Sequence, residues 1–115
     1  MNQFKEVYIL CDEAEYKKSL VKGNLIRDSL LQEGFIHASP KDQLTRVANK
    51  HYSHFLKLLV LQIDIGLCHS VVKWEPAAGS LYPHIYGPLN MSSVVKVTLF
   101  SKNESNMYGI GPSCL

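Results

Sequence analysis

An apolar stretch at residues 55–65 constrains the fold of this chain more than any other feature. It reads Phe-Leu-Lys-Leu-Leu-Val-Leu-Gln-Ile-Asp-Ile. The stretch is too short to cross a membrane as a helix, but it fits a strand that is buried on both faces. We therefore predict a central buried strand here and a fold organised around a sheet.

Other segments are also typical of strands. Each is rich in β-branched or aromatic residues and is bounded by turn-forming residues. The segments are residues 6–11, 70–75, 82–86 and 93–100, with a shorter one at 35–38. Pro83 lies inside the third of them. Because proline has no N–H to donate, we predict an irregular strand that is broken at this residue.

Two segments carry helix signals. The first begins at Asp12, which has the character of an N-cap, turns from acidic to basic along its length, and ends before Gly23. The second covers residues 40–52, where apolar side chains recur at the spacing of an amphipathic helix. We expect Ser39 to cap this helix and Pro40 to occupy its first position.

The order of these elements predicts the fold class. Strand, helix, short strand, helix and then several strands do not follow a regular βαβ alternation. We predict an α+β domain with a small antiparallel or split sheet and two main helices that cover one side. Residues 24–32 favour no single structure. The domain should span residues 1–101, and residues 102–115, which are rich in glycine and polar side chains, should form a mobile C-terminal tail.

The composition argues against several classes of protein. A chain of 115 residues with 46% hydrophobic side chains suits one domain, and 12 basic against 10 acidic residues form no dense basic cluster for nucleic acid. The three cysteines lack CxxC spacing, which argues against a disulfide framework or a four-cysteine zinc site. No apolar stretch has the length of a signal peptide or of a membrane span. We expect a soluble cytoplasmic protein, whose oligomeric state the sequence does not indicate.

Two residues near the short strand are the first candidates for a site. His37 and Ser39 are two positions apart, so they would share a face of the extended chain and could bind ribose or phosphate. As a helix cap, Ser39 would also leave N–H groups that attract anions. The alternative is that His37 is hydrogen-bonded inside the core and Ser39 is only a cap.

A second group of candidates lies in the next strands. Trp74 and Glu75 could hold a cationic or sugar-like group with an aromatic face and a carboxylate. His84 and Tyr86 are two positions apart and could donate and accept hydrogen bonds along one ligand edge. Each has a structural alternative, in which Trp74 packs on the core, Glu75 is solvated and the other two support a loop.

The histidines do not have the spacing of a metal site. A centre made of His37, His51 and His84 lacks HxH or HxxxH spacing, and we predict no metal. We expect His51, His54 and His69 on the surface. The sequence also contains no P-loop, GxGxxG or GxSxG element, so it does not support P-loop phosphoryl transfer, Rossmann dinucleotide binding or a hydrolase nucleophile elbow.

Three motifs together resemble a family of small domains, domain of unknown function 952. They are Gly34-Phe-Ile-His-Ala-Ser39, Trp74-Glu75-Pro76 and Leu81-Tyr-Pro-His-Ile-Tyr-Gly-Pro-Leu89. The resemblance extends over nearly the whole chain, to about residue 100. It implies an α+β domain similar to the ADP-ribosylation fold, which is found in ADP-ribosyltransferases and in RNA 2′-phosphotransferases that use NAD.

The resemblance also implies roles for the candidate residues, with NAD as the cofactor. By analogy with those enzymes, His37 would hold a ribose hydroxyl, and Tyr86 or Trp74 would stack on nicotinamide. Glu75 would supply the carboxylate that stabilises an oxocarbenium-like transition state. The candidate catalytic residues are therefore Glu75 and His84, and the candidate cofactor-binding residues are His37, Ser39, Trp74 and Tyr86.

The chain departs from the family in the turn after Trp-Glu. Family members often carry an arginine in this turn, whereas this chain has Ala77-Ala78-Gly79-Ser80. A guanidinium that could bind phosphate is therefore expected to be missing there. Arg27 or Arg46 is the candidate substitute.

Two functions from different classes remain open. The first is an enzyme, or a former enzyme, that binds an NAD-like or other ribose-phosphate ligand in a cleft lined by the candidate residues. The second is a non-catalytic structural or protein-interaction domain, in which the same residues stabilise a loop. Convergence of His37, Glu75 and His84 on one cleft would support the first, and imidazoles bonded to buried backbone would support the second.

Overall fold

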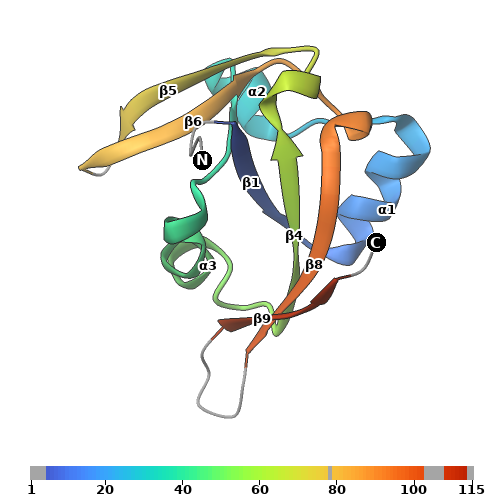
Figure 1. The fold of residues 1–115 in the computed structure, drawn as a ribbon, viewed down its shortest axis with the longest axis vertical. Coiled ribbons are helices and arrows are strands. Elements are labelled where there is room, and N and C mark those ends of the chain that lie inside the picture. The colour runs from blue at the N-terminus through green and yellow to red at the C-terminus, as the bar shows by residue number, and fades with distance from the viewer. Residues whose placement is uncertain (1–4, 78, 103–107, 114–115) are drawn as a thin grey trace.

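The apolar stretch forms the centre of a four-stranded antiparallel sheet. The computed structural model describes residues 5–77, 79–102 and 108–113, and Figure 1 shows their arrangement. The four strands, in spatial order, are β1 (Glu6–Cys11), β4 (Lys57–Asp64), β8 (Val94–Lys102) and β9 (Tyr108–Ser113). The predicted central strand is confirmed, since β4 pairs with a neighbour along each of its edges.

Two smaller antiparallel sheets accompany it. One contains β3 (Ile36–His37), β6 (Ser80–Tyr86) and β5 (Val71–Ala77) in that order, and the other pairs β2 (Asn24–Leu25) with β7 (Leu89–Asn90). In the described residues, one bridge between Ser39 and Tyr8 joins the three-stranded sheet to the edge of the large one. The prediction of an α+β domain with antiparallel sheets is therefore confirmed.

Short helices connect the strands. They are α1 (Glu13–Lys22), α2 (Asp28–Glu33) and α3 (Leu44–His51), with 3₁₀ turns at Lys41–Gln43, Ile65–Leu67 and Met91–Ser93. The predicted caps of α1 are confirmed, because Oδ1 of Asp12 accepts from the backbone N–H of Glu15 at 2.7 Å and Gly23 ends the helix with φ 84°. Among the described residues, no helix is long and apolar enough to span a membrane.

The start of α3 differs from the prediction. Ser39 does not cap this helix, because its backbone N–H and C=O pair with those of Tyr8 at 2.7 and 2.9 Å and the residue is buried. Pro40 is extended, and the α-helix begins only at Leu44, after a 3₁₀ turn. Backbone hydrogen bonding to a distant strand has outweighed the local preference of serine for a cap.

Apolar side chains are buried on both faces of the large sheet, which gives two cores. Alternate residues of β1 point to opposite faces, so that Val7 lies in one core and Tyr8 in the other. Tyr16 of α1 packs against the first core, whereas Leu44 and Ala48 of α3 belong to the second. The helices therefore lie on opposite faces of the sheet and not on one side as predicted, and Figure 1 shows α1 and α3 flanking β1 and β4.

The large sheet extends beyond the predicted end of the domain. β8 runs to Lys102, and Tyr108–Ser113 pair with it as β9, so part of the segment assigned to a mobile tail is an edge strand. The hydroxyl of Tyr108 lies 2.6 Å from the carbonyl oxygen of Phe55, which anchors β9. The remainder of the predicted tail that lies outside the described residues is 103–107 and 114–115.

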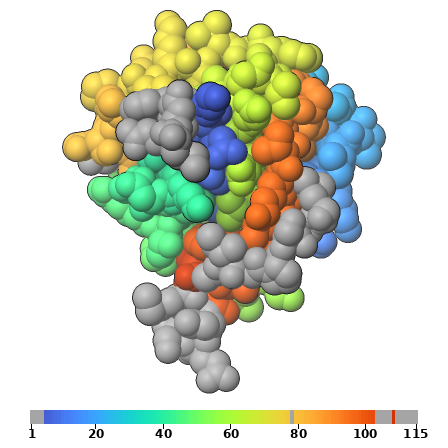
Figure 2. Space-filling model, in the orientation of Figure 1, coloured from blue at the N-terminus to red at the C-terminus, as the bar shows by residue number. Residues whose placement is uncertain are grey.

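One face of the molecule exposes part of the large sheet. Figure 2 shows β8 at this surface, below the atoms of the β5–β6 hairpin. Val95 and Lys96 of β8 are exposed, whereas Val97, the next residue, is fully buried in the first core. The apolar face of the hairpin packs against the same core, through the buried Ile85 and the partly buried Val72 and Trp74.

Replacing Leu61 with alanine tests the role of β4. Leu61 is fully buried in the first core. The substitution would remove apolar contacts and leave a cavity, so we expect the free energy of unfolding to fall by about 2–5 kcal/mol. Urea denaturation followed by circular dichroism measures this loss. Leu31→Ala is the matched control at an 86% exposed position, and equal losses in the two variants would contradict the assignment of the core.

Candidate functional site

The two candidate histidines lie side by side on the three-stranded sheet. His37 of β3 pairs directly with His84 of β6, and His84 pairs with Lys73 of β5. Because side chains alternate between the faces of a strand, this row lies on the face opposite that of Ile36 and Ile85, which are fully buried in the core. The sheet buries one apolar face and presents the histidines on the other.

Glu75 links two residues of the β5–β6 hairpin. Its Oε1 lies 2.8 Å from Nδ1 of His84 and accepts a hydrogen bond from the hydroxyl of Tyr86 at 2.5 Å. The hydrogen bonds from Tyr86 and His84 lower the pKa of Glu75, and the bond to Glu75 raises the pKa of Tyr86. Since an ionised carboxylate only accepts hydrogen bonds, Nδ1 of His84 carries a proton, and in the neutral ring Nε2 is the acceptor.

Aromatic packing holds the ring of His84 in place. The residue is 7% exposed, and its ring stacks on Phe35 with the centroids 4.0 Å apart and the planes 21° apart. The ring of His37 meets the same phenyl group edge-on, and the centroids of the two imidazoles are 5.3 Å apart. This packing and the bond to Glu75 together define one orientation for His84.

His37 is more open to solvent than His84. Its Nε2 lies 2.9 Å from Oε2 of Glu33, and the two side chains are 55% and 49% exposed. An ion pair at this exposure adds little to stability. Its effect is to orient the imidazole, because Glu33 at the end of α2 bonds one ring nitrogen and leaves the other available.

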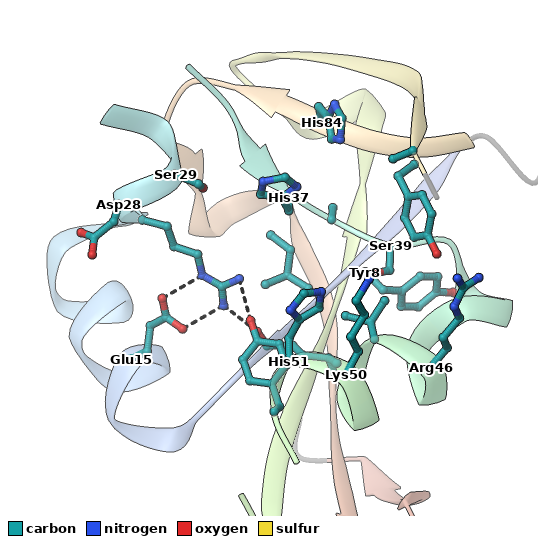
Figure 3. Close-up of a pocket in the computed structure, with 18 of the residues that line it drawn as sticks. Tyr8, Glu15, Asp28, Ser29, His37, Ser39, Arg46, Lys50, His51 and His84 are labelled. Atoms are coloured by element: carbon teal, nitrogen blue, oxygen red, sulfur yellow. Dashed lines mark hydrogen bonds and ion pairs between the residues drawn. The ribbon is translucent and has the colours of Figure 1, made fainter. Parts of the chain in front are cut away.

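A cavity of about 740 Å³ opens in front of the two histidines (Figure 3). It lies along the edge of β1, and its walls come from α3, from the start of α2, from β3 and from the β5–β6 hairpin. His37, Ser39 and His84 belong to one wall. The cavity therefore brings together three of the residues that the sequence singled out, from segments far apart in the chain.

The opposite wall is basic. Arg46, Lys50 and His51 of α3 line the cavity, and Figure 3 shows them across from His37 and His84. Arg46 and Lys50 are four residues apart, which places them on one face of the helix. Neither has a carboxylate partner among the described residues. This wall offers an anionic ligand two uncompensated cations.

Arg27 lines the cavity too, but its charge is compensated. Its Nε and Nη2 donate to the two carboxylate oxygens of Glu15 at 2.9 Å, and Nη2 also donates to the carbonyl oxygen of Leu10 at 2.5 Å. Nη1 donates to the hydroxyl of Tyr52 at 3.2 Å. Burial by itself would lower the pKa of Arg27, but the hydrogen bond to Glu15 and the nearby negative charge raise it overall. Arg27 thus ties α1, α2 and β1 together.

The sequence candidates occupy different positions relative to the cavity. His37, Ser39 and His84 lie in its wall. Glu75 and Tyr86 do not line it, but they lie directly behind His84, since Glu75 bonds both side chains. The structure therefore groups five of the six candidates, three as wall residues and two as supporting residues.

Trp74 does not belong to this group. It pairs with the buried Pro83 and packs against the first core, on the opposite face of the sheet from Glu75. The physical reason is the two-residue period of a strand, which directs adjacent side chains to opposite faces. Trp74 and Glu75 therefore cannot present an aromatic face and a carboxylate to the same ligand.

Sequence reasoning named Arg46 as a candidate phosphate-binding residue but missed Lys50 and His51 of the basic wall. His51 was expected on the surface, and it is exposed, but together with Lys50 it lines the cavity. The spacing of Arg46 and Lys50 was a signal that they share a helix face. That this face turns toward the histidines depends on the packing of Leu44 and Ala48 into the second core, which the sequence does not specify.

The cysteines contribute no activated thiol among the described residues. Burial, helped by the charge of Glu15, raises the pKa of Cys11 to about 12, and burial also raises the pKa of Cys68. A thiol with a raised pKa is a poor nucleophile at neutral pH. Within the same residues, no three histidine, cysteine or acidic side chains are grouped so that they could hold a metal ion. The polar groups that line the cavity are imidazoles, hydroxyls, cations and the carboxylates of Glu15 and Asp28.

Comparison with known proteins identifies the family. The sequence profile of the family described as protein of unknown function DUF952 matches residues 10–97. The chain belongs to this family. The matched residues include the three histidines that line the cavity and the whole of α3. No curated protein shows significant similarity to the chain.

The fold is shared with protein CC0527 from Caulobacter crescentus. A crystal structure of CC0527 has a TM-score of 0.80 and 24% identity, over 90% of this chain and 93% of that chain, and a crystal structure of its double mutant gives the same values. A solution NMR structure of CC0527 has a TM-score of 0.75 and 25% identity, over 90% of each chain. These similarities establish the fold and do not identify a ligand.

The lowered pKa of Glu75 predicts a pH-dependent contribution to stability. A carboxyl group whose pKa is lower in the folded state stabilises the fold above its ordinary pKa, and this contribution is lost as the pH falls through the lowered value. We therefore expect Glu75→Gln to reduce the melting temperature more at about pH 6 than at about pH 3. Thermal unfolding of both proteins measures the difference. Glu13→Gln is the exposed control, and a pH-independent loss in Glu75→Gln would contradict the prediction.

Arg27→Ala tests the network at the edge of β1. The side chains of Arg27 and Glu15 are 17% and 29% exposed. The substitution would leave this carboxylate and the carbonyl of Leu10 without their donor, so we expect a loss of about 1.5–3 kcal/mol in the free energy of unfolding. Arg46→Ala removes the same charge from an exposed position and should cost less than about 0.5 kcal/mol. Urea titration would show equal losses if Arg27 were only a surface cation.

Proposed function

We propose that the cavity binds a small ligand that contains ribose and phosphate, with NAD and ADP-ribose as the first candidates. One observation carries this proposal: His37 and His84 face Arg46 and Lys50 across a single cavity. Imidazoles can bond ribose hydroxyls, and guanidinium and ammonium groups bind phosphate. The two walls thus match the two parts of such a ligand.

The size and the mixed lining of the cavity support this ligand class. Its volume of about 740 Å³ lies within the range of roughly 300–1,000 Å³ that is typical of small-molecule sites. The rings of Tyr8 and Tyr82 also lie in the wall. Such rings can stack on a base or on nicotinamide.

The choice of NAD rests on the resemblance of the sequence motifs to the ADP-ribosylation fold. The position of His37 in the wall suits the ribose role of that analogy. For the stacking role, Tyr82 is better placed than either aromatic residue expected from the sequence. Glu75 does not line the cavity, so in ADP-ribosyl transfer it would act through His84. The geometry supports ligand binding more directly than it supports this reaction.

We assign the phosphate groups to Arg46 and Lys50, and not to Arg27. Four hydrogen bonds and the charge of Glu15 already occupy the guanidinium of Arg27. The side chains of Arg46 and Lys50 are exposed at the cavity wall and can adjust to a ligand. They compensate for the absence of an arginine in the turn after Glu75.

Thermal-shift measurements with NAD, ADP-ribose and AMP test the proposal. A ligand that binds only the native state stabilises it, by about 2.7 kcal/mol when its concentration is 100 times Kd. We expect a rise in melting temperature for the wild type, a smaller rise for His37→Ala, and none for Arg46→Ala/Lys50→Ala, because the phosphates lose both cations.

Lys18→Ala/Lys22→Ala is the matched control. It removes the same charge from exposed positions on α1, away from the cavity, and should keep the shift of the wild type. An equal loss in both double variants would indicate non-specific attraction of anions. No shift with any of the nucleotides would contradict the proposal and favour an interaction domain.

A further inference from the structure

Two pairs of histidine and carboxylate lie next to each other at the cavity. In one pair, Nδ1 of His84 lies 2.8 Å from Glu75, and in the other, Nε2 of His37 lies 2.9 Å from Glu33. The two imidazoles are direct cross-strand neighbours, and their ring centroids are 5.3 Å apart. Two carboxylate-oriented imidazoles in contact are the arrangement needed for paired proton transfer.

Each imidazole keeps one ring nitrogen available. Nε2 of His84 and Nδ1 of His37 make no hydrogen bond to any of the described residues, and both side chains line the cavity. Nε2 of neutral His84 can accept a proton, because its Nδ1 donates to Glu75. Nδ1 of protonated His37 can donate a proton, while its Nε2 bonds Glu33.

The surroundings of the two rings separate their roles. His84 is 7% exposed and stacked on Phe35, and the charged or titratable groups around it are Glu75, Tyr86, Lys73 and His37. His37 is exposed and faces Glu33 and His84. The buried, rigid ring suits a base that acts in one position, and the exposed ring can exchange its proton with solvent.

We propose that His84 and His37 are a general base and a general acid that hydrolyse a cyclic phosphodiester of ribose, a nucleoside 2′,3′-cyclic phosphate. This inference rests on the proposed function, because it assumes the same ribose-phosphate ligand in the same cavity. The basic wall selects an anion, and Arg46 and Lys50 stabilise the charge that develops on the phosphate oxygens.

The reaction needs only water as a second reactant. The oxygen of water attacks phosphorus, and Nε2 of His84 takes the proton from that water. The P–O bond to the ribose 2′ oxygen breaks, the bonding electrons stay on this oxygen, and it takes the proton of Nδ1 of His37. The product is a ribose 3′-phosphomonoester, and exchange with solvent restores the protonation of both rings.

Glu75 is a positioning residue in this mechanism. It does not line the cavity, but it holds the Nδ1 proton of His84 and stabilises the imidazolium that forms when the base takes a proton. Glu33 has the same relation to His37, and it stabilises the acid before the reaction. The two carboxylates therefore affect opposite limbs of the pH profile.

Hydrolysis of 2′,3′-cyclic AMP by the full chain, followed by chromatography of the AMP product, tests the proposal. Loss of an acid or base typically costs about 10²- to 10⁴-fold in rate, and we expect this loss in His37→Ala and in His84→Asn. Asparagine can still donate to Glu75, which protects the fold, and melting temperatures verify folding. His69→Ala is the control, because His69 is exposed and outside the cavity wall.

The pH profile of kcat/KM separates positioning from structural effects. We expect a bell-shaped profile for the wild type. Glu75→Gln should change the acidic limb, which reports the base that this carboxylate positions, and Glu33→Gln should change the alkaline limb, which reports the acid. A uniform loss of rate without movement of either limb would overturn the assignment of the carboxylates.

Failure of this inference is distinct from failure of the proposed function. If folded wild type hydrolyses 2′,3′-cyclic AMP no faster than His37→Ala/His84→Asn prepared in the same way, the acid–base pair is overturned, even where NAD or ADP-ribose produces a thermal shift. Hydrolysis that depends on both histidines supports the acid–base pair, even where neither NAD nor ADP-ribose binds.

Discussion

The open edge of β1 is the constraint on which the site depends. β1 pairs with β4 over its whole length, whereas in the described part of the chain its other edge makes one bridge, between Tyr8 and Ser39. The backbone groups of an unpaired edge need other partners. The bridge brings β3 and His37 to this edge, and Arg27 bonds the carbonyl of Leu10. The cavity is the space that these attachments leave beside the strand.

The charge of the cavity wall depends on which of its cations already form ion pairs with carboxylates. The chain has a formal charge of only +2 and no basic cluster in its sequence. Nevertheless, one wall of the cavity is basic, because Glu15 compensates Arg27 while Arg46 and Lys50 have no carboxylate partner among the described residues. Pairing and not total charge determines where an anion is attracted.

The register of the β5–β6 hairpin determines which side chains of the site meet. Lys73 lies directly opposite His84, and Glu75 lies opposite Tyr82, so Glu75 reaches His84 as a diagonal neighbour. This contact places the carboxylate behind the ring and leaves the far nitrogen toward the cavity. Phe35 stacks on the ring and completes its support. The site residues are therefore held by regular structure, which favours a defined geometry.

Interactions between neighbouring residues account for much of the local structure. The apolar strand, the caps of α1 and the face shared by alternate residues depend on short-range sterics and hydrogen bonding, which neighbouring residues set. Ser39 marks the limit of that reasoning, because a bridge to a distant strand replaced the expected cap. Long-range packing, in contrast, turns Arg46 and Lys50 of α3 toward His37 and places Glu75 behind His84. Those contacts join separate segments, and the burial of both faces of the large sheet determines how the segments meet.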